Sequence, residues 1–272
     1  MRVLGPFAAS VDGAPVDLGG PRQRAVLGRL VVAGGHVVST DRLIDDLWDS
    51  SDVPAKALAV LQVHVSHLRR ALEPGRERRA PARILVSAAP GYALRLPAAA
   101  VDAWHFDDLV RRAAAAPPGP AHELLTEALA AWTGPAYAEV ADESWAAPEV
   151  ARLTELRLAA IEARAEADLA LGRPAPVIAD LERHLHDHPG REDAVRLLAL
   201  ALYRTGRQGD ALTVLRRARD HLAEELGVDP GPALRALEDD ILRQSPVLDA
   251  EPRGGRRGRR DPGAGVGGAD PY

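Results

Sequence analysis

The segment from Pro54 to Leu72 is a two-faced helix, and it constrains the N-terminal part of the chain more than any other feature. Its apolar side chains recur at helical spacing and fall on one stripe. The stripe consists of Leu58, Leu61, Val65, Leu68 and Leu72. The opposite face carries small, amide, hydroxyl, imidazole and basic side chains, and the whole segment lacks Asp and Glu. Such a helix can bury its leucine stripe and enter a DNA major groove with its other face.

The elements before this segment are read from turn and cap residues. Residues 2–18 predict two strands joined by a tight turn at Asp12-Gly13, because both residue types accept a positive φ. Pro21 predicts the first turn of a helix, and Ser39 predicts the N-cap of a second helix. The N-terminal region therefore begins with a small sheet and two helices.

The elements after the segment complete a recognisable order. Two β-rich runs flank Pro90-Gly91 and predict a hairpin, or wing. A small sheet, three helices and a terminal hairpin are typical of a winged helix-turn-helix. Helical periodicity becomes almost continuous beyond Pro97, so we predict that the first domain covers residues 1–97.

Residues 98–248 carry an internal repeat. A shift of 34 residues places Ala199 on Ala165 and Gly206 on Gly172, and 34 residues is the tetratricopeptide (TPR) period. The expected fold is therefore mainly α with a small amount of β: a winged helix-turn-helix with a short β-sheet and a wing hairpin, followed by an all-α, TPR-like array without strands. A chain of 272 residues is long enough for two separate cores. Residues 249–272, rich in Gly and Arg, are predicted to be disordered.

Charge divides the chain in the same way. Residues 1–100 hold 13 Lys and Arg against 9 Asp and Glu, whereas residues 101–248 hold 16 against 26. The basic part is the one expected to face a polyanion.

Several classes of protein are disfavoured. The chain has no cysteine, and we find no phosphate-binding loop or nucleophile motif, so neither an enzyme nor a cofactor is expected. His184 and His188 share a helical face, but a third metal ligand is not evident, and helix-end histidines are the simpler interpretation. With no apolar run of membrane length and no leader segment, we expect a cytoplasmic protein without membrane contact.

A set of short motifs carries a family resemblance. The first domain contains GPRQRAVLGRL, VVSTDRLIDDLW, LQVHVSHLRRAL and PGYAL, and the second contains VDAWHFDDLV, EALAAWTGPAYAEV and LALYRTGRQGDAL. In this order they resemble the Streptomyces antibiotic regulatory protein family, which joins an OmpR-type winged helix to a bacterial transcriptional activation domain. The resemblance implies an activator that binds promoter direct repeats of double-stranded DNA as a homodimer, contacts RNA polymerase and switches on an antibiotic gene cluster.

In that interpretation the third helix reads DNA. Arg69 and Arg70 are the strongest candidates to reach bases or phosphates, because Arg forks suit guanine. Side chains at the starts of the first two helices are candidates for phosphates, and Arg95 is a candidate for the minor groove or phosphate at the wing. The full set of predicted DNA-binding residues is Arg22, Arg24, Ser39, Arg42, Lys56, Gln62, Val63, Ser66, His67, Arg69, Arg70 and Arg95.

A second interpretation stays open on the sequence. The helical array is also suited to binding a partner protein or a small effector, with a winged helix that does not read DNA. The contrast between a basic N-terminal part and an acidic array favours the promoter-bound activator.

Overall fold

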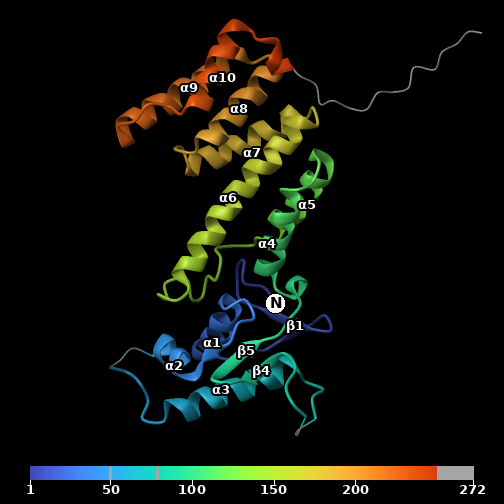
Figure 1. Cartoon of the computed structure of the whole chain (residues 1–272), viewed down its shortest axis with the longest axis vertical. Helices are drawn as coiled ribbons and strands as arrows, with labels where there is room; N and C mark the ends of the chain where they lie inside the picture. The colour runs from blue at the N-terminus through green and yellow to red at the C-terminus, as the bar shows by residue number, and fades with distance from the viewer. Residues whose placement is uncertain (49–50, 78–79, 250–272) are drawn as a thin grey trace, which may run out of the picture.

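The computed structural model describes residues 1–48, 51–77 and 80–249. The molecule is elongated, with the winged helix at one end and a stack of helices at the other (Figure 1). The N-terminal part consists of β1 (Ala9–Val11), β2 (Ala14–Val16), α1 (Pro21–Val32), β3 (Val38–Ser39), α2 (Thr40–Leu47), α3 (Ala57–Leu72), β4 (Leu85–Ala88) and β5 (Gly91–Leu94). The predicted order of small sheet, three helices and wing is confirmed.

The predicted turn and cap residues have their expected conformations. Asp12 and Gly13 have φ values of 49° and 81°, and they join β1 and β2 in an antiparallel pair. Pro21 stands at the first turn of α1. The Ser39 hydroxyl accepts a hydrogen bond from the Arg42 amide at 3.2 Å and so caps α2. Local sequence therefore sets the start of both helices.

The wing belongs to a three-stranded sheet in the order β3-β5-β4, and all the pairs are antiparallel. Gly91 begins β5 beside β3. A Cβ atom at Gly91 would lie 1.9 Å from the Val38 carbonyl oxygen, so the close approach of these two strands requires glycine.

The long helix of the winged part differs from the sequence prediction at its start. α3 begins at Ala57, after a turn in which the Ala57 amide donates to the Pro54 carbonyl. Ala57 is the inward residue of the first turn, so Leu58 is rotated out of the apolar stripe and is 48% exposed. The other four predicted stripe residues, Leu61, Val65, Leu68 and Leu72, are buried.

The C-terminal part is helical, and no strand occurs there among the residues described between 98 and 249. The helices are η1 (Ala98–Ala100), α4 (Asp102–Ala113), α5 (Pro118–Ala130), α6 (Ala147–Ala170), α7 (Pro174–Asp187), α8 (Glu192–Arg204), α9 (Gln208–His221), η2 (Leu222–Leu226), α10 (Pro232–Arg243) and η3 (Pro246–Asp249). Gly172 and Gly206, with φ values of 71° and 78°, follow α6 and α8 at the two positions related by the 34-residue shift. The predicted tail lies, apart from Asp249, outside the described residues, and Asp249 ends η3.

The sequence led us to expect that the hydrophobic cores divide at residue 97. The structure shows a different division. One core joins the winged helix to α4, α5 and the first part of α6, and includes Val26, Leu61, Phe106 and Tyr137. A second core begins within α6 at Ala165 and extends to η3. The array thus contributes its first three helices to the core of the winged helix.

The N-terminal segment fastens these two parts together. The Asp102 carboxylate, at the start of α4, accepts hydrogen bonds from the amides of Val3 and Leu4 at 2.8 and 3.0 Å. The amides of Thr133 and Tyr137 donate to the carbonyls of Leu4 and Val3 at 2.8 and 2.6 Å. The first residues of the chain are therefore hydrogen-bonded directly to the helical array.

Candidate nucleic-acid interface

The outer face of α3 is a continuous exposed stripe opposite the buried one. Its residues follow one another at steps of one and three, so they share one side of the helix. They are Leu58, Ala59, Gln62, Val63, Ser66, His67 and Arg70, and we refer to them as the α3 outer face. α3 lies at the opposite end of the molecule from α7 to α10, so the array does not cover this face (Figure 1).

The chemistry of the α3 outer face is mixed. Gln62, Ser66, His67 and Arg70 supply hydrogen-bonding groups, and the side chain of Val63 is 51% exposed among them. No Asp or Glu occurs in α3. Amide and guanidinium groups match base edges, and exposed apolar groups match the methyl group of thymine.

Arg70 and its neighbour Arg69 have different surroundings. The Arg70 side chain is exposed and makes no ion pair or hydrogen bond with another described residue. Arg69 donates from Nε to the Leu85 carbonyl at 2.8 Å and from Nη2 to the Ser87 hydroxyl at 2.9 Å. Its guanidinium also lies 5.7 Å from the ring centroid of Tyr92. Arg69 therefore fastens α3 to the wing, and a contact with base edges would require these bonds to be released, so its role in reading bases stays a prediction.

The wing arginine is also engaged within the protein. Arg95 is exposed, but its Nη1 donates to the Gly35 carbonyl at 2.8 Å. This contact joins the end of the wing to the turn after α1, so the predicted grip on the minor groove would require the bond to be released.

Three predicted phosphate contacts at α1 and α2 are partly used in the fold. Arg22 is exposed, lies 3.6 Å from Asp52 and sits 6.0 Å from the ring centroid of Trp48. Arg42 is exposed but pairs with the buried carboxylate of Asp46 at 2.9 Å. The Ser39 hydroxyl serves as the α2 cap.

Arg24 is the predicted phosphate ligand with a direct ion pair to the helical part of the protein. Its Nη1 pairs with Glu139 at 2.7 Å and its Nε donates to the Gly19 carbonyl at 3.0 Å. Because Glu139 belongs to the helical part, Arg24 bridges the two parts of the chain, and a phosphate would have to compete with this carboxylate; its assignment as a phosphate ligand stays a prediction.

The structure thus gathers five predicted residues on one face and separates the others from it. Gln62, Val63, Ser66, His67 and Arg70 lie on the α3 outer face, with exposed Lys56 just before the helix. The sequence analysis placed Leu58 in the buried stripe and so left it out of the exposed face. The four-residue spacing of positions 58, 62, 66 and 70 was the pattern that could have placed it there. Burial lowers the pKa of nearby His64, and the charges of His67 and Arg22 lower it further.

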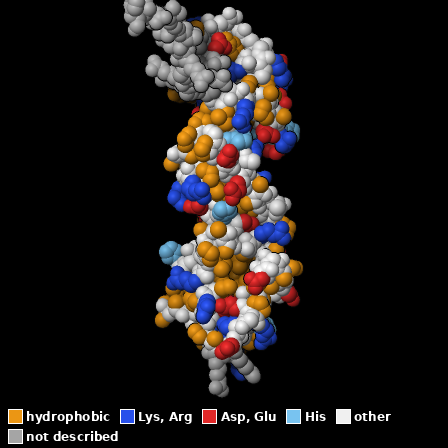
Figure 2. All heavy atoms as spheres, turned by 90° about the vertical axis from the view of Figure 1, so that its right-hand side faces the viewer, with side chains coloured by type: hydrophobic (Ala, Val, Ile, Leu, Met, Phe, Trp, Pro, Cys, Tyr) orange, Lys and Arg blue, Asp and Glu red, His pale blue; other side chains and the backbone are white. Residues whose placement is uncertain are grey.

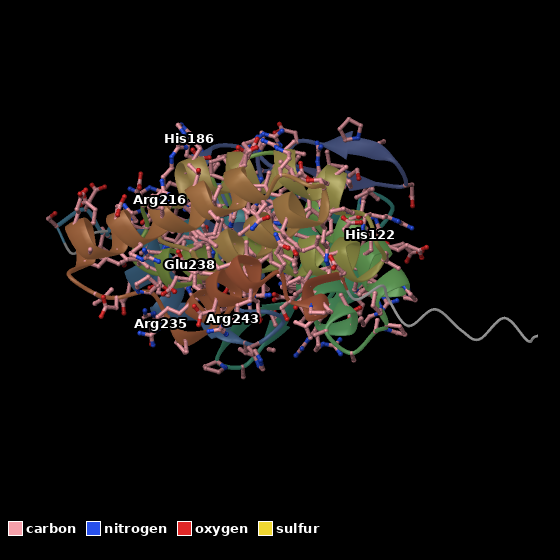
Figure 3. The ribbon with its side chains drawn as sticks, turned by 90° about the horizontal axis from the view of Figure 1, so that it is seen from above. His122, His186, Arg216, Arg235, Glu238 and Arg243 are labelled. Carbon is pink, nitrogen blue, oxygen red and sulfur yellow. The ribbon has the colours of Figure 1, made fainter. Side chains whose placement is uncertain are left out.

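The histidines of the array do not converge on a metal position. His184 is buried and its Nε2 lies 3.3 Å from the Glu162 carboxylate, whereas His186 points away from the helices at the edge of the molecule (Figure 3). His184 lies in the last turn of α7, as the sequence predicted, and there it is a buried partner of a carboxylate. In the described part of the chain, no group of three His, Cys, Asp or Glu could hold a metal ion.

The surface of the molecule is electrically mixed on the side that Figure 2 presents. Basic and acidic side chains alternate along the described residues of this side, from the winged helix to the array. The contrast in net charge between the two parts is therefore not gathered into a patch of one sign on this side. Among residues 1–48, 51–77 and 80–249, no helix has both the length and the apolar character needed to span a bilayer.

Two family models match the chain. The model described as bacterial transcriptional activator domain matches residues 101–242, and the model described as transcriptional regulatory protein, C terminal, matches residues 13–94. Both descriptions are of transcriptional regulators and not of enzymes.

Curated relatives give the same result. The transcriptional regulatory protein EmbR of Mycobacterium tuberculosis is 41% identical over 253 residues, which is 92% of this chain and 64% of EmbR. The transcriptional regulator RedD of Streptomyces coelicolor is 36% identical over 91% of this chain and 71% of RedD. The regulatory protein AfsR of Streptomyces coelicolor is 39% identical over 90% of this chain and 24% of AfsR. The chain thus spans less than two thirds of EmbR and 71% of RedD.

A solved structure shares the architecture. Mycobacterium tuberculosis EmbR in complex with a low-affinity phosphopeptide superposes with a TM-score of 0.81 at 40% sequence identity, covering 89% of this chain and 64% of EmbR. The matched models, the relatives and this structure agree on one assignment. The chain belongs to the Streptomyces antibiotic regulatory protein family of transcriptional regulators, in which a winged helix precedes a bacterial transcriptional activator domain.

Proposed function

We propose that this regulator is a sequence-specific activator that inserts the α3 outer face into the major groove of promoter DNA. The observation that supports this most strongly is Arg70, an exposed guanidinium without a partner among the described residues, on a helix face free of carboxylates. Arg70 reaches a guanine edge or an adjacent phosphate, and Gln62, Ser66 and His67 set base preference. Lys56, Arg22 and Arg42 lie outside this face and contribute phosphate contacts.

The proposed binding unit is a pair of protomers on direct repeats. Family membership supports this arrangement, and tandem docking places half-sites about one helical turn, roughly 10 to 11 base pairs, apart. The pair forms on DNA as a homodimer in which both protomers have the same orientation.

The proposed outcome is recruitment of RNA polymerase to an antibiotic or other secondary-metabolite gene cluster. The relatives AfsR and RedD support a regulator of this type. The loop between α2 and α3, of which residues 51–53 are described and exposed, is suited to contact polymerase because it projects beside the DNA-facing helix.

Footprinting with the Arg70→Ala variant tests the proposal. We expect specific affinity to fall by about 1 to 3 kcal/mol while the melting temperature stays unchanged. Arg235→Ala is the matched control, because Arg235 is an exposed arginine on α10 (Figure 3) and has no ion pair with another described residue. Full protection of the promoter by Arg70→Ala would contradict the proposed reading face.

A further inference from the structure

A hollow between α6 and α7 lies outside the winged helix. It has a volume of about 290 Å³. Its charged and imidazole lining residues are Arg157, Arg164, Asp180, Arg183, His184, Asp187 and His188. Three arginines and two imidazoles face two carboxylates there, and the volume is close to the lower limit for small-molecule sites.

The carboxylate of Asp180 is already neutralised within the hollow. It lies 2.8 Å from Arg164 and 3.8 Å from Arg183. Arg164 is thus the close partner of this carboxylate, whereas Arg183 makes only a long contact with it, and Asp187 is the other acidic group of the lining. The lining is therefore able to accept an anion.

Arg157 is the arginine without an anionic partner. Its guanidinium is stacked 4.7 Å from the ring centroid of Trp132. It is partly buried, and it makes no ion pair or hydrogen bond with another described residue. Burial lowers the pKa of Arg157, since no neighbouring carboxylate offsets the loss of water. A stacked, partly dehydrated guanidinium with free N–H donors is a common anchor for carboxylates and phosphates.

The next repeat shows that the fold does not require four of the polar residues of the hollow. A shift of 34 residues relates four charged or imidazole residues of the hollow to apolar residues of α8, α9 and η2. Arg164, Asp180, His184 and His188 correspond to Leu198, Val214, Ala218 and Leu222. Leu198 and Ala218 are buried in the second core, and Val214 packs against it. Repeat packing is thus satisfied by apolar residues at these four positions, so these four polar residues need another explanation. Arg157 and Arg183, by contrast, correspond to the arginines Arg191 and Arg217 of the next repeat.

A buried ionic cluster supports one side of the hollow. Glu162 pairs with Arg191 and with His184, whose side chain lines the hollow. Arg191 also contacts Glu155 at 2.6 Å. This cluster fixes the His184 ring and the start of α8, so the hollow has a rigid wall.

We propose that the α6–α7 hollow binds a small organic anion through a carboxylate or phosphate group, with Arg157 and Arg183 as its principal ligands and His188 beside them. The regulator would then carry an effector site in its first TPR-like pair, separate from the DNA-facing helix. The proposal does not depend on the α3 outer face.

Calorimetric titration of the full chain tests this site, with inorganic phosphate and citrate as separate probes at low ionic strength. We expect saturable binding of at least one probe, and the stronger probe identifies the recognised group. Arg157→Ala should weaken that binding by about tenfold or more, because a charge-assisted bidentate contact is lost. Arg183→Ala, at a highly exposed side chain, provides a second variant in case Arg157→Ala is unstable.

Two controls locate the site. Arg70→Ala and Arg235→Ala lie on the α3 outer face and on α10, and both should bind the anion like the unaltered protein. If the protein bound neither phosphate nor citrate up to about 10 mM, the proposal would be overturned. If Arg157→Ala and Arg183→Ala both bound the probe as tightly as the unaltered protein does, the proposal would also be overturned.

Discussion

The Trp145 indole Nε1 donates a hydrogen bond to the backbone carbonyl of Asp46, at 3.0 Å, across the boundary between the helical array and the winged helix. Trp145 is buried, and Asp46 lies in α2 with its carboxylate held by Arg29 and Arg42. A second indole, that of Trp104, donates in the same direction to the Val31 carbonyl at 3.2 Å. Two indole groups of the array are therefore hydrogen-bonded to the backbone of α1 and α2.

Replacing Trp145 tests how much its hydrogen bond to Asp46 stabilises the protein. Trp145→Phe keeps an aromatic ring but leaves the Asp46 carbonyl without its donor and opens a small void. We expect the free energy of unfolding to fall by about 1 to 3 kcal/mol, which is the usual cost of an unsatisfied buried group. Chemical denaturation followed by circular dichroism measures the change, and Arg235→Ala serves as a surface control. Unchanged stability would show that the indole bond contributes nothing to the junction.

Arg69 and Arg70 form a natural pair for separating stability from DNA affinity. Arg69→Ala removes two hydrogen bonds to β4 and a cation–π contact with Tyr92, so we expect a loss of about 1 to 3 kcal/mol in unfolding free energy. Arg70→Ala should leave that free energy unchanged. Thermal melts of both variants check this, and the idea fails if Arg70→Ala is the less stable of the two.

The exposed Val63 side chain predicts a contact with a thymine methyl group. Replacing thymine by deoxyuridine in the operator removes only that methyl, and we expect the affinity of the unaltered protein to fall by about 1 kcal/mol at the contacted position. Val63→Ala should bind both DNAs with nearly equal affinity. Fluorescence anisotropy with single-position substitutions measures the four affinities. If Val63→Ala retains the full preference for thymine, Val63 does not make the contact.

Glu162 predicts a pH dependence of stability. Burial alone raises its pKa, but hydrogen bonds and charge interactions with His184 and Arg191 outweigh burial and lower the pKa to about 2. A carboxyl whose folded pKa is depressed contributes stability that is present above its unfolded pKa of 4.5 and is lost as the pH falls toward 2.

The Glu162→Gln variant tests that dependence. It should be less stable than the unaltered protein at pH 6, because it replaces a buried ion pair by a neutral amide. Between pH 4.5 and 2 its stability should fall less steeply than that of the unaltered protein, since the carboxyl is gone. Parallel pH profiles for the two proteins, obtained from urea denaturation, would contradict the lowered pKa.

The sequence by itself determined the elements that depend on neighbouring residues. The Asp12-Gly13 turn, the Ser39 cap and four of the five stripe positions of α3 follow from backbone preference and periodicity, and all are confirmed. The 34-residue shift likewise predicted helix pairs in which the first helix ends at Gly172 and at Gly206, and these glycines follow α6 and α8. Periodicity succeeds here because it reports which side of a helix faces a core.

Only the tertiary structure decided which charged side chains are free. Arg24 pairs with a carboxylate 115 residues away, and Arg69 is engaged by a wing that begins 16 residues later. Periodicity carries no information about what lies across from an exposed position, so the sequence could not distinguish Arg69 from Arg70. The position of the core boundary inside α6 was hidden for the same reason, because it depends on how the array packs back onto the winged helix.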